Sequence, residues 1–136
     1  MNTTLLLFCL LLSTTVITSA QDIGRIKSVS NNQYLNVETG QVQTSEIKDD
    51  WLSARWDLVK TADGYYNIVS GWKGNMRSLT GDQLQCIAAD KSSNQAKWDI
   101  RKTEGTNEVR IYNVADTTLA INVEKGAPAA TIIGNE

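Results

Sequence analysis

The chain has 136 residues, of which 13 are basic and 15 acidic, and its formal net charge is −2. Charges of both signs are interspersed along it, which argues against a nucleic-acid partner, because a phosphate-binding face needs clustered Lys and Arg. The chain has no histidine and only two cysteines, which excludes Ser-His-Asp catalysis, Cys-His catalysis and a thiolate metal site.

The first 20 residues predict a secretory signal peptide. An apolar run at residues 5–12 is followed by a polar stretch and the small-residue site TSA at 18–20. The run is shorter than the ~20 residues needed to span a bilayer, although the lack of Lys or Arg before it leaves an uncleaved anchor as the alternative. We expect cleavage before Gln21 and one secreted domain at 21–136. Cys86 would then be its only cysteine, unable to form an internal disulfide and buried as a small hydrophobe.

Short segments separated by turn residues predict an all-β domain without helices. Pro128 is expected in a turn between strands, where its missing N–H costs nothing. The eleven predicted strands cover residues 25–30, 34–37, 41–44, 55–60, 65–70, 76–79, 84–88, 97–102, 109–114, 120–123 and 130–133.

These strands recur with a period of about 42 residues. The segment ARWDL at 54–58 returns as AKWDI at 96–100, and alternating segments at 26–30, 66–70 and 111–115 open the three copies. A fixed period of this length indicates repeating units that share one core. The predicted core consists of Ile26, Val29, Leu35, Val37, Trp56, Leu58, Tyr66, Val69, Met76, Ser78, Trp98, Ile100, Ile111, Val114, Ile121 and Val123.

This pattern resembles the β-trefoil, and within it the ricin-B-type lectin family, over the whole of residues 21–136. The family motif Leu-Asp-Val followed by Gln-X-Trp is approximated by LNV at 35–37 with ARW at 54–56, by MRS at 76–78 with AKW at 96–98, and by INV at 121–123. The resemblance implies a pseudo-threefold barrel of twelve strands. A third tryptophan would fall near position 140, so the third repeat is expected to lack its last strand. Three explanations are a truncated record, a strand that is dispensed with, or one supplied by another molecule.

The resemblance also implies carbohydrate binding through an aspartate, a stacking aromatic ring and a nearby Asn or Gln. Carried over by position, the aspartate becomes Asn36, Arg77 and Asn122, while the aromatic positions fall near Ser45, Ile87 and Ile133, which cannot stack. The usual galactose site of the family is therefore not reproduced. Loop tryptophans could instead supply the ring, unless they fold back over the end of the barrel. The candidate ligand-binding residues are Asn36, Trp51, Trp72, Asn75 and Asn122.

The sequence thus predicts a secreted, non-enzymatic module that binds carbohydrate or glycoprotein glycans, without cofactor, metal or membrane span. A carboxylate pair is the enzyme chemistry left open, but Asp57 and Asp99 each follow a repeated tryptophan and should face solvent or pair locally, so no catalytic residue is expected. One alternative is a β-trefoil proteinase inhibitor that presents residues 46–53 or 90–95 to a protease, with Lys48 or Lys91 at the apex. Another is a structural or venom protein that binds no sugar.

Overall fold

The computed structural model describes residues 22–72, 77–80, 84–124 and 127–132. The predicted signal segment at 1–20 lies outside these residues, as do Asn75 and Met76. The described part is all β apart from short 3-10 turns such as η1 (Leu52–Ala54) and η3 (Asn94–Ala96). Its eleven strands are β1 (Asp22–Gly24), β2 (Tyr34–Asn36), β3 (Gln43–Ser45), β4 (Trp56–Lys60), β5 (Tyr66–Ser70), β6 (Arg77–Thr80), β7 (Gln85–Ile87), β8 (Trp98–Lys102), β9 (Val109–Asn113), β10 (Leu119–Glu124) and β11 (Ala127–Ile132).

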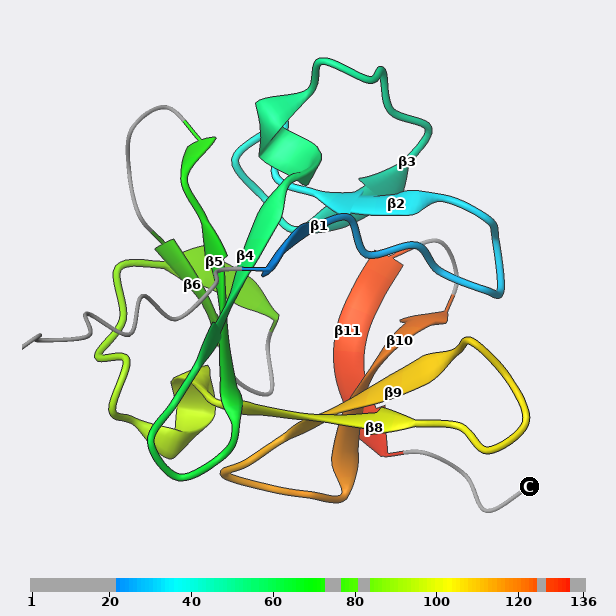
Figure 1. Ribbon diagram of the computed structural model, residues 1–136. Helices are drawn as coiled ribbons and strands as arrows, with labels where there is room; N and C mark the ends of the chain where they lie inside the picture. Colours follow the sequence, from blue (N-terminus) through cyan, green and yellow to red (C-terminus); the bar gives the residue numbers. More distant parts are fainter. Residues whose placement is uncertain (1–21, 73–76, 81–83, 125–126, 133–136) are drawn as a thin grey trace, which may run out of the picture.

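Nine of the described strands form one antiparallel sheet, and β2 and β3 form a separate two-stranded sheet (Figure 1). Strands β1, β4, β5, β8 and β9 pair in that order, while β2–β3, β6–β7 and β10–β11 are hairpins. The order strand, hairpin, strand therefore occurs twice, in β1 to β4 and in β5 to β8, and β9 with the hairpin β10–β11 begins it again. This order agrees with the arrangement that the sequence resemblance implied.

Tight turns join the long hairpins between successive units. The turn from β4 to β5 is closed by the Thr61 N–H, which donates to the carbonyl of Tyr65 at 2.8 Å. Gly64 has φ 90° and Gly105, in the turn from β8 to β9, has φ 74°. Glycine adopts this left-handed conformation without the steric penalty of a Cβ atom, so both turns can be short enough to keep the paired strands in register.

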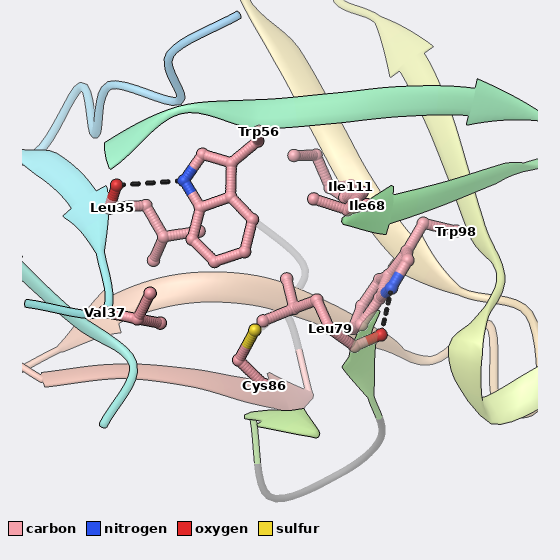
Figure 2. Packing of buried hydrophobic residues seen from close by; sticks show 8 residues of the cluster. All are labelled: Leu35, Val37, Trp56, Ile68, Leu79, Cys86, Trp98 and Ile111. Carbon is pink, nitrogen blue, oxygen red and sulfur yellow. Dashed lines mark hydrogen bonds between the residues drawn. The ribbon is translucent and has the colours of Figure 1, made fainter. Parts of the chain in front are cut away.

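Two fully buried tryptophans each connect one hairpin to the strand that follows it: Trp56 binds the first hairpin and Trp98 the second (Figure 2). The Nε1 of Trp56 donates to the carbonyl of Leu35, and that of Trp98 to the carbonyl of Leu79, each at 3.0 Å. Each ring buries on the order of 200 Å², so the pair supplies much of the core. The other buried members of the cluster are Leu35, Val37, Ile68, Leu79, Cys86 and Ile111.

An alanine lies two residues before each of these tryptophans, and its small side chain lets the backbone approach the core closely. Ala54 ends η1 and Ala96 ends η3, and both are fully buried. The predicted burial of Cys86 is confirmed, with 9% of its surface exposed. Ile26, Leu58, Ile100 and Ile121 are partly buried and pack against the cluster, as predicted.

The prediction for the first strand is wrong in position. β1 covers Asp22–Gly24, and the chain turns at 28–33, where the Asn32 N–H donates to the Ser28 carbonyl and the Ser28 N–H to the Gln33 carbonyl. Val29 was predicted in the core but is 72% exposed, because it lies on this turn. The polar residues around it favour the turn, which alternation alone did not reveal.

Two further predictions are corrected by the strand register. Pro128 lies within β11, opposite Val123, and not in a turn; β11 is the last strand of the sheet order, and proline is tolerated on such an edge. The second correction concerns Tyr66, which was predicted as the core equivalent of Ile111. Leu58 pairs with Ile68, just as Ile100 pairs with Ile111. The residue of β5 that is equivalent to Ile111 is therefore Ile68, which is fully buried. The predicted Tyr66 is half-buried, two residues away on the same face of the strand.

Candidate functional site

Four polar or aromatic side chains share the face of the first hairpin, β2–β3, that is opposite to the face of Leu35. Tyr34 and Asn36 alternate with the buried Leu35, and across the hairpin they pair with Ser45 and Gln43. Side chains at directly opposed positions of an antiparallel pair lie on the same face. The hairpin therefore places an aromatic ring beside a group of amide and hydroxyl groups.

Asn36 is the centre of this group. It is fully buried, and its Nδ2 donates to the Tyr34 carbonyl at 3.1 Å and to the Ser45 hydroxyl at 2.8 Å. Its Oδ1 accepts from Gln43 Nε2 at 3.0 Å and from the Glu38 N–H at 3.2 Å. Both donors and both lone pairs of the amide are thus in use, so Asn36 fixes its neighbours and does not itself meet a ligand.

Glu38 is held in place from a different element. The Ser53 hydroxyl, on the buried side of η1, donates to Glu38 Oε2 at 2.5 Å, while the Val37 N–H donates to the Ser53 carbonyl at 3.1 Å. Thr39 Oγ1 lies 3.5 Å from Gln43 Oε1 at the other side of the group. Glu38 and Gln43 are half-buried, so a carboxylate and an amide are oriented by the fold and still reach solvent. We call Tyr34, Asn36, Glu38, Gln43 and Ser53 the hairpin site.

The described residues of the second hairpin do not repeat this combination. The carbonyl of Leu79 receives the Trp98 indole as that of Leu35 receives the Trp56 indole, so Thr80 is the residue equivalent to Asn36. Thr80 pairs with Gln85. The sequence-based assignment of Arg77 to this position is therefore wrong by three residues. Ile87, which pairs with Ser78, is 40% exposed at the position predicted for the aromatic ring.

The third hairpin keeps one half of the polar pair. Asn122 in β10 takes the position of Asn36, as predicted, but Ala129 is its partner on β11. The position opposite Ala120, which corresponds to Ser45, is Thr131; the predicted aromatic position at Ile133 lies outside the described residues. Among the described residues, the Asn–Gln pair is thus found on the first hairpin.

The described members of the predicted site lie on several elements. Trp72 is half-buried and packs against the core cluster, which favours the alternative of a tryptophan that folds back onto the barrel over that of an exposed platform. Trp51 is half-buried immediately before η1. Asn36 and Asn122 belong to different hairpins, and Asn75 lies outside the described residues.

Sequence reasoning missed Tyr34, Glu38, Gln43 and Ser53. The alternations YLN and QTS on either side of Gly40 could have placed Tyr34, Asn36 and Gln43 on one face, because residues two apart in a strand share a face. No local signal could have found the contact between Glu38 and Ser53, which are 15 residues apart.

Away from the hairpin site, Asp90 and Asp116 each have a pKa that is lowered by a residue two positions later in the chain. The pKa of Asp90 is lowered by hydrogen bonds from the side chain and backbone of Ser92, and that of Asp116 by the same two bonds from Thr118. Lys48 and Lys91, named above for an inhibitor loop, are both exposed. Within the described ranges, His, Cys, Asp and Glu form no group of three suited to a metal ion. No helix in the part of the chain that the structure describes is long and apolar enough to cross a membrane.

No protein-family model and no curated protein sequence matches this chain. Several solved structures are similar to it. The GlcNAcα1-4Gal-releasing endo-β-galactosidase from Clostridium perfringens is 18% identical, with a TM-score of 0.71 over 83% of this chain and 29% of that protein. A mosquitocidal holotoxin is 12% identical, with a TM-score of 0.72 over 87% of this chain and 16% of the toxin.

A third similar structure is a designed protein with threefold symmetry, ThreeFoil, which is 17% identical with a TM-score of 0.64. That match covers 81% of this chain and 86% of the designed protein. The chain thus spans most of a symmetric single-domain protein but under a third of the natural enzyme. The strand order, the two buried tryptophans and these similarities together show that the chain has the β-trefoil fold.

Proposed function

We propose that this protein is a secreted, non-enzymatic carbohydrate-binding module and that the hairpin site receives the sugar. The observation that carries the proposal is the convergence of Gln43 and the Glu38 backbone on the buried Asn36 amide, next to the Tyr34 ring. Sugars are bound by oriented polar groups that match hydroxyl pairs and by an aromatic ring that covers the apolar face of the pyranose. The hairpin site contains both kinds of group.

Each residue has a distinct role in this proposal. Asn36 and Ser53 are positioning residues, since their polar atoms hold Gln43 and Glu38. The Glu38 carboxylate and the Gln43 amide exchange hydrogen bonds with sugar hydroxyls; a bond to a charged acceptor contributes about 1.5–3 kcal/mol. Tyr34 supplies the ring. Lys27 lies over that ring with Nζ 5.4 Å from its centroid, and this exposed side chain moves aside when a pyranose stacks there.

Two further observations support the proposal. The fold is shared with an endo-β-galactosidase that releases a disaccharide, and residues 1–20 have the pattern of a secretory signal, which would bring the protein to extracellular glycans.

A glycan array on the protein tests the proposal, with a circular dichroism melt to show that each sample is folded. Gln43→Ala should weaken binding to the bound sugars by about tenfold, the equivalent of about one hydrogen bond between neutral groups. Gln85→Ala is the matched control, because Gln85 takes the same position on the second hairpin opposite Thr80. A folded protein that binds no glycan, or one in which both variants lose affinity equally, would refute the proposal.

A further inference from the structure

The segment before Trp56 carries an apolar pair that the fold does not require. Trp51 is the N-cap residue of η1 and Leu52 is its first residue, with 58% of the leucine surface exposed. Trp56 and Trp98 are equivalent, so the same positions in the second repeat, 42 residues later, are Ser93 and Asn94. The equivalent turn of the second repeat, η3, therefore forms with polar residues at both positions.

The exchange of serine for tryptophan removes a helix cap. In η3 the Ser93 hydroxyl accepts the Gln95 N–H at 3.3 Å, whereas Trp51 makes no side-chain cap bond in η1. Replacing a capping serine by a residue that cannot cap costs about 0.5–2 kcal/mol in helices, and a leucine that is 58% exposed gains little from burial in the folded monomer. Trp51 is half-buried, so part of its ring packs in the fold and part stays accessible. The stability of the domain therefore does not explain the leucine, and explains the tryptophan only in part.

The pair adjoins the hairpin site. Ser53, the next residue after Leu52, is the donor to Glu38, and its carbonyl holds the Val37 N–H. Because η1 is a single turn, Trp51 and Leu52 lie within one turn of the group that orients the Glu38 carboxylate. The apolar pair thus directly precedes, in the chain, the residue that joins η1 to the hairpin site.

We infer that Trp51 and Leu52 form a second subsite, which contacts the apolar face of the next sugar unit of a glycan bound at the hairpin site. This inference rests on the proposed function and names its ligand class: an oligosaccharide of at least two units, in place of a single monosaccharide. Pyranose rings present C–H groups on one face, and burial against an aromatic ring and a leucine removes them from water. Polar groups of the hairpin site bind the first sugar unit, and Trp51 and Leu52 contact the apolar face of the second.

Titration calorimetry with a monosaccharide and with the corresponding di- and trisaccharide tests the inference, using the sugar selected by the array. The measured quantity is the gain in affinity from the second unit. Trp51→Ser and Leu52→Asn, which introduce the residues of the second repeat, should each reduce that gain by about fivefold to tenfold. The melting temperature should stay the same for Leu52→Asn, because that side chain is exposed; in Trp51→Ser the restored cap offsets part of the lost packing.

Asn94→Ala is the matched control, since Asn94 occupies the position of Leu52 in η3; it should leave the gain unchanged. If the second unit adds no affinity in the wild type, or if Trp51→Ser weakens mono- and disaccharide equally, the second subsite is refuted while the hairpin site stands. Failure of every sugar to bind overturns both. A fall in the melting temperature of Leu52→Asn would make the leucine a structural residue and overturn the inference.

Discussion

Replacing Trp98 by phenylalanine should destabilise the domain strongly, although an aromatic ring remains. Trp98 is fully buried and its Nε1 donates to the Leu79 carbonyl at 3.0 Å. Phenylalanine has no donor, and the loss of one partner in a buried hydrogen bond costs about 1–3 kcal/mol. The smaller ring also leaves unfilled space, which adds about 1–2 kcal/mol. The sum of about 2–5 kcal/mol is a large share of the ~5–15 kcal/mol that stabilises a typical domain.

Chemical denaturation followed by circular dichroism measures this loss, and a thermal melt should show a decrease of about 8–20 °C at ~4 °C per kcal/mol. Trp56→Phe should have a similar effect, because its indole makes the equivalent bond to Leu35 at the same distance. Trp51→Phe is the control: this ring is half-buried and its indole makes no hydrogen bond within the described residues. A loss for Trp98→Phe no greater than for Trp51→Phe would refute the reasoning.

Three other changes test the structure. Asn36→Asp restores the residue of the lectin motif but should destabilise by about 1–3 kcal/mol in urea unfolding at neutral pH, because a carboxylate cannot donate to the Tyr34 carbonyl; unchanged stability would contradict the network. A hydrogen bond from Lys97, followed by one from Thr61, holds the pKa of Asp63 below its ordinary 3.8. The pKa is lower in the folded state, so this contribution is present above pH 3.8 and lost as the pH falls through the folded-state value. Asp63→Asn should flatten the acid limb of the stability curve, and an identical limb would argue against the bond. Cys86, 9% exposed, should react with a thiol reagent slowly in buffer and fast in denaturant; fast reaction in buffer would disprove its burial.

The sequence predicted the architecture well, because the features that define it are local and repeated. The two tryptophans, the short strands and the turns at glycine are visible as spacing and residue type, and ten of the eleven predicted strands overlap an observed strand, the exception being the segment 25–30. The alternation of a strand has a period of two residues. A shift by two therefore leaves the buried face unchanged, which is why Tyr66 was predicted where Ile68 is buried.

Less of the candidate site could be predicted, since its contacts join residues from separate elements. Carrying a family motif over by residue type named Asn36 but could not give its burial or its four internal hydrogen bonds, because these are properties of the folded hairpin. Trp72 was expected in a loop from its glycine neighbours, yet its ring packs against the core cluster. Large aromatic rings are more often used for packing than left in water, and only the tertiary structure decides between the two.

The indole bonds have a consequence for how such a sequence can diverge. Each indole donates to a main-chain carbonyl, and every amino acid supplies one, so the accepting position places no demand on its own side chain. The acceptor lies 21 residues before Trp56 but 19 before Trp98, so hairpins of different length keep the same indole hydrogen bond. Substitutions on the polar face of a hairpin therefore need not disturb the buried framework. One repeat can change its polar face while the other repeats keep the same core.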